Sequence, residues 1–410
     1  MISKISALLD YCLIIFIFIS TYSVFWVSSI NNNLFRVLIL GTTILLILIN
    51  ILKNGLIIKV QELQAMLIYI IVSVALLIFN YLIYFPGVNL FIINNILLLI
   101  SFWLLGSIYF RNNRIHLFME RVVNVTLILA IVSLFFWTLG SLLGFISPTG
   151  YIVTSWGDAY YKVSSYQNIY FETQKIKLLG FEGWRNNGIF IEGPMYNIVL
   201  SISLLYLSLF KTRIELKKII ILIIAIFSTF STTGILLVAF IVFYKLFFRK
   251  RISKTFFFSL LIIFPMISSY GLRFISNLLG DKASTRSASI RLDDISAGVK
   301  SWEEHILFGN GYNNRQAIVS HMNLNIRPNV GFSNGILEIL SDGGIVLFTM
   351  LFLPLLFFLF KSTVAFNTKV VILIWFILLF ITIICKTPLF MIVCGFSYAA
   401  LFHIDSSNQS

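Results

Sequence analysis

The sequence predicts an all-α polytopic integral membrane protein with about 12 transmembrane helices and two long outer loops. Three observations lead to this fold class. The 410 residues are 59% hydrophobic and only 11% charged, with a mean hydropathy of +0.96. Apolar runs of membrane-spanning length follow one another along the chain, and basic residues gather in the short segments between them. We therefore expect one membrane domain covering residues 1–410.

Composition also excludes other classes of protein. A formal net charge of +14 would suggest a nucleic-acid partner in a soluble protein. Here the cations lie in short connections, where they set topology, so no nucleic-acid partner is implied. Cys12, Cys385 and Cys394 lie in or at the end of apolar runs without metal-type spacing, so no disulfide framework is expected. No internal repeat points to an inverted-repeat transporter.

The transmembrane helices are expected wherever about 20 apolar residues can cross the hydrocarbon core. They lie near residues 8–30, 34–52, 65–85, 89–110, 122–147, 189–210, 218–230, 233–248, 255–272, 334–360, 369–385 and 388–404. The first run is too long for a signal peptide and should remain as a helix. The seventh and eighth are short and flank a small polar turn, so residues 218–248 either cross the membrane twice or re-enter it.

The orientation follows from the short connections. By the positive-inside rule, the side with the basic connections is cytoplasmic, and both termini lie there. The residues on that side are Lys4, Lys53, Lys59, Arg111, Arg114, Arg121, Lys211, Arg213, Lys217, Lys218, Lys245, Arg249, Lys250, Arg251, Lys254, Lys361 and Lys369. Two long segments, 148–188 and 273–333, are then outer loops, and we expect the chemistry there.

The first outer loop ends in the stretch GFEGWRNNGIFIEGPMY, residues 180–196. Its Arg185 precedes an apolar run that contains Glu192. A carboxylate inside an apolar run should face protein or a wet cavity, which makes Glu192 a candidate functional residue. Trp184 and the loop's other aromatic residues either stack on sugar rings or form an aromatic belt on the headgroups.

The second outer loop contains a predicted helix, residues 289–311, with Asp293 and Asp294 near its start. Arg291 on this helix has two interpretations. It forms an i, i+3 ion pair with Asp294 on a solvated surface, or it presents its guanidinium to an anion at the membrane.

The stretch GFSNGILEILSDGG, residues 331–344, re-enters the membrane with Ser333 or Asn334 as its N-cap. Asn334, Glu338 and Asp342 recur every four residues and form one polar stripe. The stripe either lines a cavity or makes hydrogen bonds between helices.

Three motifs together resemble the O-antigen polymerase and ligase superfamily of bacterial membrane glycosyltransferases. Arg185-x-x-Gly188-x-Phe190-x-Glu192 is similar to its R-x-x-G-x-F-x-E element. Arg291, Trp302 and Gly309-Asn310-Gly311 are similar to its second-loop element. The run from Ser333-Asn334 to Gly343-Gly344 resembles its closing element, and Ser231-Thr232-Thr233-Gly234 resembles a polar turn earlier in the family.

The resemblance implies a C-type glycosyltransferase-like fold and an enzyme that polymerises polyprenyl-diphosphate-linked oligosaccharide repeat units at the outer (periplasmic) face of the inner membrane. The product would be O antigen or a related surface polysaccharide. Ligases of this group carry a His before the Asn, where this chain has Ser333, which favours the polymerase branch. The alternatives are an O-antigen ligase and a lipid-linked oligosaccharide flippase.

The site residues follow from the same resemblance. Arg185 and Arg291 would stabilise the departing diphosphate, and the base would be Glu192 or His321, although Glu192 could instead be the ion-pair partner that positions Arg185. Substrate binding is assigned to Trp184, Arg286, Asn334 and Glu338. We expect no metal and no cofactor, since the loops lack ligand clusters. The expected partners are the lipid-linked donor and acceptor, membrane lipid and a chain-length regulator protein.

Overall fold

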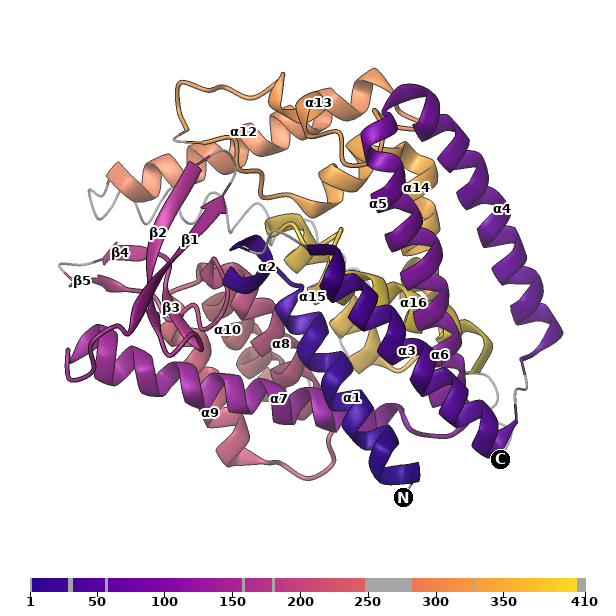
Figure 1. Cartoon of the computed structure of the whole chain (residues 1–410), viewed down its shortest axis with the longest axis horizontal. Helices are drawn as coiled ribbons and strands as arrows, with labels where there is room; N and C mark the ends of the chain where they lie inside the picture. Colours follow the sequence, from indigo (N-terminus) through magenta and orange to yellow (C-terminus); the bar gives the residue numbers. More distant parts are fainter. Residues whose placement is uncertain are drawn as a thin grey trace.

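The computed structural model describes residues 2–28, 32–55, 58–156, 159–178, 181–247, 282–327 and 329–403. Figure 1 shows a mostly helical molecule with small strands at one end. The described helices are α1 (Ile2–Ile19), α2 (Val24–Ser28), α3 (Asn32–Asn54), α4 (Val60–Ile83), α5 (Val88–Phe91), α6 (Leu99–Arg111), α7 (Ile115–Phe136), α8 (Gly193–Leu209), α9 (Leu216–Ser228), α10 (Thr232–Phe247), α12 (Lys282–Glu304), α13 (Arg315–Val319), α14 (Gly335–Phe360), α15 (Phe366–Ile381) and α16 (Pro388–His403).

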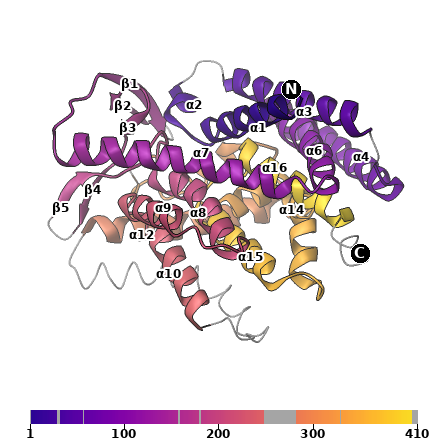
Figure 2. The same cartoon turned by 90° about the horizontal axis from the view of Figure 1, so that it is seen from below.

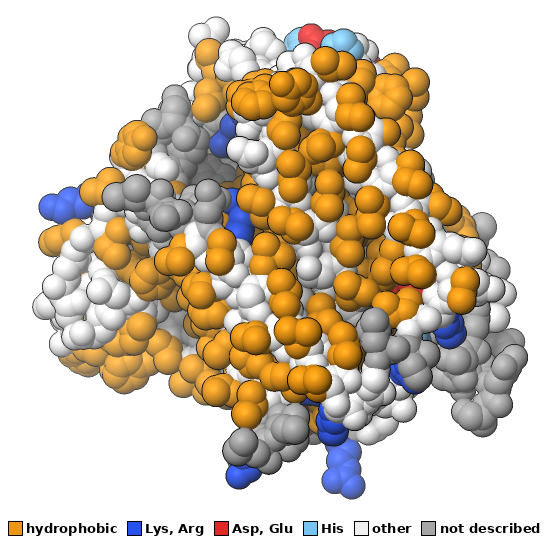
Figure 3. All heavy atoms as spheres, turned by 45° about the vertical axis from the view of Figure 1, so that its right-hand side comes forward, with side chains coloured by type: hydrophobic (Ala, Val, Ile, Leu, Met, Phe, Trp, Pro, Cys, Tyr) orange, Lys and Arg blue, Asp and Glu red, His pale blue; other side chains and the backbone are white. Residues whose placement is uncertain are grey.

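Among the described residues, five helical stretches are long and apolar enough to cross a membrane. They are Leu34–Asn54, Val60–Ile83, Phe85–Arg111, Ile115–Leu142 and Gly335–Phe360, and α8, α15 and α16 are shorter apolar helices. Figure 3 shows hydrophobic side chains covering most of one face, with Lys and Arg side chains along its lower edge. Such a surface suits lipid, so the protein is a polytopic membrane protein. The predicted helix 255–272 lies outside the described residues.

The predicted first helix, 8–30, is in fact broken between α1 and α2. Ser20, Thr21 and Ser23 turn their hydroxyls back to carbonyl oxygens four residues earlier, and Tyr22 has a positive φ of 52°. The break pairs with the 189–191 segment. The Val24 N–H donates to the Ile189 carbonyl at 2.8 Å, and the Ile191 N–H donates to the Tyr22 carbonyl at 3.1 Å. The N-terminal helix is thereby tied to the Arg185–Glu192 loop.

The first long connection, residues 148–188, folds into two small antiparallel sheets, which the all-α prediction missed. The strands are β1 (Gly150–Trp156), β2 (Ala159–Tyr166), β3 (Tyr170–Glu172), β4 (Lys175–Leu178) and β5 (Phe181–Trp184), with sheet orders β1-β2-β3 and β4-β5. Tyr166 and Tyr170 are buried, whereas Tyr160 is 80% exposed. Sugar stacking and headgroup contact therefore remain alternatives only for the exposed rings.

The helices behind these sheets form the core. Figure 2 shows α7 running from the strands at one end across α8 and α9. The two short helices α9 and α10 are joined by a turn at Thr229–Ser231. The Asn186 N–H donates to the Ser228 carbonyl at 3.0 Å, so this turn reaches the Arg185–Glu192 loop. The predicted pair of short helices is thus present, with its turn beside the candidate site.

The predicted helix 289–311 starts earlier and ends sooner, since α12 covers Lys282–Glu304. It crosses the molecule beside α14 in Figure 1, and the two helices pack together. α14 is itself broken: Gly343 and Gly344 have non-helical dihedrals, with φ of 60° at Gly344. These two features place the second long connection against the middle of a membrane-spanning helix.

Candidate active site

The loop from Arg185 to Glu192 runs between β5 and α8, and Gln174 anchors both of its ends. The Arg185 N–H donates to the Gln174 carbonyl at 3.0 Å. The Gln174 side chain donates from Nε2 to Oε1 of Glu192 at 3.2 Å. Glu192 is the N-cap residue of α8, so it lies just before the apolar helix, whereas the predicted helix 189–210 placed it inside. Its carboxylate therefore faces the loop and the strands.

Glycines allow this loop to sit close to its neighbours. Gly188 has φ of 56° and packs on the Tyr196 ring, where an added Cβ would lie 3.2 Å from the nearest ring atom. A Cβ at Gly193 would lie 3.0 Å from the Thr229 carbonyl oxygen, and one at Gly234 would lie 2.5 Å from Oδ1 of Asn197. The glycines of the first motif and of the polar turn thus permit α8, α10 and the loop to approach one another.

Arg185, Glu192 and Arg291 form one electrostatic group, although Arg291 comes from α12, about 100 residues farther along the chain. Burial raises the pKa of Glu192 to about 7, against the positive charges of Arg185 and Arg291 and the Gln174 hydrogen bond. Burial also lowers the pKa of Arg185 and of Arg291, and the Glu192 carboxylate counteracts this in both. The structure therefore brings together Arg185, Glu192 and Arg291, which the sequence analysis selected as candidate catalytic residues.

Neither guanidinium has a hydrogen-bond or ion-pair partner among the residues that the structure describes. Nε of Arg185 is buried without a partner. The predicted ion pair of Arg291 with Asp294 does not form, because the Asp294 carboxylate binds Arg327 and Ser333 instead. Two partly buried cations beside a carboxylate, one of them with a buried donor that has no described partner, are suited to an anionic ligand.

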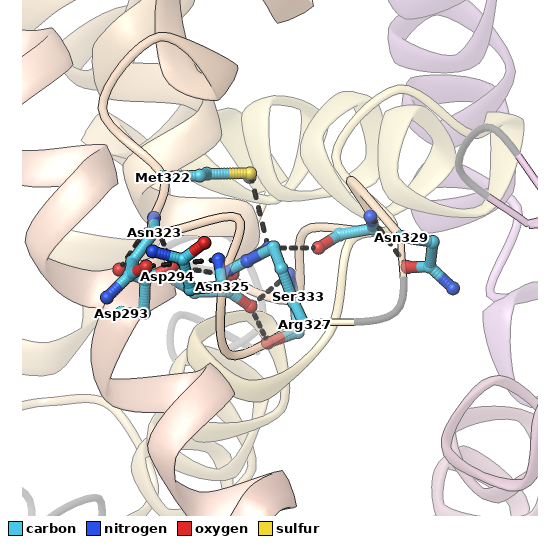
Figure 4. A network of polar contacts seen from close by, with 9 residues as sticks. Asp293, Asp294, Met322, Asn323, Asn325, Arg327, Asn329 and Ser333 are labelled. Atoms are coloured by element: carbon cyan, nitrogen blue, oxygen red, sulfur yellow. Dashed lines mark hydrogen bonds and ion pairs between the residues drawn. The ribbon is translucent and has the colours of Figure 1, made fainter.

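Arg327 locks α12 onto the segment that leads into α14 (Figure 4). Its Nη2 lies 2.5 Å from Oδ2 of Asp293 and 2.8 Å from Oδ1 of Asp294, and its Nη1 donates to the Gly331 carbonyl at 2.9 Å. The Ser333 hydroxyl donates to Oδ2 of Asp294 at 2.6 Å. Asp293 and Asp294 lie in the middle of α12, so the interpretation of this pair as a helix start was wrong. They hold the loop that follows, and this fixes the helix that carries Arg291.

A second lock fills the break in α14. The Asn310 and Gly311 N–H groups donate to the carbonyls of Ser341 and Asp342 at 2.7 and 3.2 Å, and Ile345 and Val346 donate to the carbonyls of Ile306 and Leu307. The glycines make this possible, since a Cβ on Gly309 would lie 2.4 Å from the Gly343 nitrogen. The G-x-G element and the Gly343-Gly344 pair are therefore two halves of one junction, which satisfies the carbonyls that the broken helix frees.

The polar stripe on α14 meets a lysine that the sequence analysis did not select. Nζ of Lys386, on the turn between α15 and α16, lies 2.9 Å from Oε1 of Glu338 and 2.8 Å from Oδ2 of Asp342. The Cys385 thiol donates to the other Glu338 oxygen at 2.8 Å. The charges of Glu338 and Lys386 act on the phenol of Tyr22, in the break between α1 and α2. The polar stripe of α14 therefore lies in a buried ion cluster with Lys386, so lining a cavity is not its only role.

The other predicted site residues lie in different surroundings. Nε2 of His321 lies 3.0 Å from Oε1 of Glu304, which is about 20 Å along α12 from Arg291 at 1.5 Å per residue. The Trp184 ring is covered by the Lys175 ammonium, 4.9 Å from its centroid, and the Trp184 carbonyl accepts from Trp137. The Asn334 side chain caps α14 by accepting from the Leu337 N–H at 3.0 Å. The Arg286 side chain lies outside the described residues.

Three residues of the assembled site were missed by the sequence analysis: Gln174, Arg327 and Lys386. Lys386 had a usable signal, because a lysine between two apolar runs needs buried carboxylates, and Glu338 and Asp342 were unpaired in the sequence interpretation. Arg327 had a weaker signal, since the adjacent Asp293 and Asp294 required a cation. Gln174 had none, because its role depends on the sheet.

Comparison with known proteins agrees with the motifs. The sequence model of a family described as O-antigen ligase matches residues 219–352, which include Arg291, the G-x-G turn and the Asn334–Gly344 stretch. No curated protein matches the chain. Arg185 and Glu192 lie before the matched residues, and the structure joins them to Arg291. Residues 219–352 are thus similar to the O-antigen ligase family, in agreement with the superfamily that the motifs resemble.

Proposed function

We propose that this protein polymerises polyprenyl-diphosphate-linked oligosaccharide repeat units at the outer face of the bacterial inner membrane, with both of its termini in the cytoplasm. The observation that carries the proposal is the convergence of Arg185, Arg291 and Glu192 from two distant motifs. The reaction needs an anion site and a base in one place, and this group supplies both. The second long connection brings the cation, and the loop before α8 brings the carboxylate.

The two arginines stabilise the leaving group. When the bond between the anomeric carbon and the diphosphate oxygen breaks, its electron pair leaves with the diphosphate, and negative charge develops there. Guanidinium groups stay protonated and bind phosphate oxygens in pairs. Nε of Arg185 is buried without a described partner, and burial acts on both guanidiniums, which strengthens contacts of this kind.

Glu192 is the general base in this proposal. It takes the proton of the acceptor hydroxyl while the oxygen bonds to the anomeric carbon. A base works best when its pKa lies near the operating pH, and burial brings the pKa of Glu192 to about 7. The described contacts include no ion pair between Arg185 and Glu192, so positioning Arg185 is not the role we assign to this carboxylate. His321 is not assigned this role, because its partner Glu304 lies about 20 Å along α12 from Arg291.

The polymerase is favoured over the ligase by Ser333. In this chain the Ser333 hydroxyl donates to Asp294 and so belongs to the Arg327 lock. It offers no imidazole at the position where the ligases carry one. A flippase would carry its key charges along helices that line a central path, whereas Arg291 and Arg185 lie on the second connection and on the loop before α8.

The reaction as proposed requires neither a metal nor a cofactor. Within the described ranges, no group of three or more His, Cys, Asp or Glu side chains could hold a metal ion. Purified protein given lipid-linked repeat units should extend them in excess chelator. Loss of extension in chelator, with recovery on adding magnesium, would contradict this part of the proposal.

A gene disruption separates the three functions on one gel. A strain without the polymerase carries single repeat units on the final acceptor, a strain without the ligase carries none there, and a strain without the flippase retains its units inside. We expect single units, and we expect ladders to return with the wild-type gene but not with Glu192→Gln. Absence of all units from the acceptor would assign the ligase instead.

A further inference from the structure

A large apolar cavity lies among the helices, outside the candidate active site. Its volume is about 480 Å³, and α1, α7, α8, α14, α15 and α16 all contribute to its walls. Typical wall residues are Ile14, Phe118, Leu205, Phe358 and Phe396. Among the lining residues of the described chain, the polar side chains are His116, Tyr206, Thr368, Trp375 and Ser397.

Such a space does not stay empty and does not suit water. Protein interiors hold few voids larger than one water molecule, and apolar cavities remain dry and take up apolar ligands. Within a membrane protein the available apolar ligand is a hydrocarbon chain. The cavity volume falls within the range of ordinary small-molecule pockets, which are about 300–1,000 Å³.

The cavity opens at one end. His116 is exposed and Phe210 is 39% exposed, and both lie at the end of the cavity next to the short connections. At the other end, Leu378 and Leu389 are only 1% and 5% exposed. Phe210 follows α8 and Glu192 precedes it, so the mouth is about 25 Å from the active-site loop at 1.5 Å per residue.

The rim of the mouth is basic. Arg114, Lys211 and Lys218 on the connections beside it pair with Asp10, Glu120 and Glu215. The cations of these connections outnumber these three acids. These cations are Arg111, Arg114, Lys211, Arg213, Lys217, Lys218, Lys361 and Lys369. Clusters of Lys and Arg beside membrane helices attract anionic headgroups.

We propose that the cavity binds one acyl chain of an anionic glycerophospholipid, with the phosphate at the His116 end and the chain running toward Leu378 and Leu389. The closed inner end and the distance from Glu192 separate this site from the proposed polyprenyl-diphosphate site. The lipid acts as a structural ligand that fills the space between α8, α15 and α16. The inference does not depend on which glycan the protein transfers.

Photolabelling tests the site directly. The full chain in lipid nanodiscs is given phosphatidylglycerol with a diazirine in its acyl chain, irradiated, digested and mapped by mass spectrometry. In the wild type we expect label on wall residues of α8 and α15. The Val371→Trp variant, in which the indole fills the cavity, should lose this label. Ile131→Trp, on the 53% exposed outer face of α7, is the matched control and should retain it. If Val371→Trp does not fold, Ser397→Leu takes its place.

Two results would overturn the proposal. One is equal labelling of the cavity wall in wild type and in the filled variant, which would mean that the label marks only the bulk bilayer. The other is displacement of the label by polyprenyl phosphate but not by unlabelled phosphatidylglycerol, which would assign the cavity to the carrier lipid. Displacement by phosphatidylglycerol alone supports the site as proposed.

Discussion

The backbone N–H of Asn310 donates to the carbonyl oxygen of Ser341 at 2.7 Å, which inserts the G-x-G turn into the break of α14. With the three neighbouring backbone hydrogen bonds, this contact links the connection that carries Arg291 to the helix that carries Glu338 and Asp342. The second and third family motifs are therefore one structural unit.

Replacing Gly309 by Ala should disrupt this unit. The new Cβ would lie 2.4 Å from the Gly343 nitrogen, in a backbone conformation with φ of 71°, so we expect a loss of about 1–3 kcal/mol in unfolding free energy. Thermal unfolding of the purified protein measures it. Gly41→Ala is the control, because nothing lies within 4 Å of its added Cβ. Equal stability of the two variants would contradict the assignment.

Arg185→Lys and Arg291→Lys should each abolish long-chain product while membrane abundance stays near normal. A point ammonium cannot make the paired contact to phosphate, and losing such a donor set costs about 3 kcal/mol, or about a hundredfold in rate. The lipid-linked product is measured by its ladder of chain lengths. Arg213→Lys, on an exposed connection, should be silent. Normal ladders in both site variants would remove the guanidiniums from the chemistry.

Activity should rise with pH through an apparent pKa near 7, because Glu192 must lose its proton to act as a base. The dependence of kcat/KM on pH measures this. The Glu192→Gln variant should lose most of its activity and also the rise of kcat/KM with pH. The Glu303→Gln variant, changed on an exposed face of α12, should keep both. A rising limb that persists in Glu192→Gln would move the base elsewhere.

The same carboxyl should give stability a defined pH dependence. Its folded pKa of about 7 lies above the ordinary value of 4.5, so the folded state holds the proton that the unfolded chain has released. Stability should therefore fall as the pH rises from about 4.5 to about 7. The midpoint of thermal unfolding at both ends of this range, in wild type and in Glu192→Gln, isolates the contribution. If the difference in unfolding midpoint between wild type and Glu192→Gln were the same at both ends of this pH range, the predicted contribution of Glu192 would be refuted.

Arg327→Met should destabilise the protein more than the loss of one surface charge does. Its removal leaves the carboxylates of Asp293 and Asp294 without their cation in a buried site, which costs about 3–5 kcal/mol. Thermal unfolding again measures the effect, with Lys300→Met on the exposed face of α12 as the control. Stability within error of that control would mean that the lock does not hold α12.

Cysteine labelling with a membrane-impermeant reagent tests the orientation. Gln167→Cys and Ser320→Cys, both at exposed positions in the long connections, should react in intact spheroplasts. Arg213→Cys and Ser362→Cys, exposed on the basic short connections, should react only after permeabilisation. The reverse pattern would invert the topology and place the proposed site on the wrong side for its substrate.

The sequence predicted the helices well where hydropathy decides them. The ranges of α4, α10 and α16 agree with the predicted runs to within a few residues, because an apolar stretch in lipid has few alternatives to a helix. It failed at Tyr22, since the run 8–30 is apolar throughout and the break depends on pairing with residues 189–191. It also failed for the strands of residues 150–184, whose pairing is set by neighbours far from any hydropathy signal.

The site was predicted in part. Arg185, Glu192 and Arg291 were selected from motifs, and the structure groups them. Arg291 was also given a surface ion pair with Asp294, which fails because Arg327, 33 residues beyond Asp294, binds that carboxylate instead. His321 was chosen for its ordinary chemistry alone, and the structure places it beside Glu304, about 20 Å along α12 from Arg291. Periodicity shows which residues share a helix face, but it does not show which distant cation reaches that face.

The junction between the G-x-G turn and α14 also sets an order of events during biosynthesis. The G-x-G turn is synthesised before α14, so it remains an open loop until residues 341–346 have left the ribosome. The half of α14 beyond Gly344 begins with N–H groups that only Ile306 and Leu307 satisfy among its described contacts. Insertion of this helix into the bilayer is thereby coupled to capture of the turn, and a nascent chain that misses it would leave open hydrogen-bonding groups in hydrocarbon.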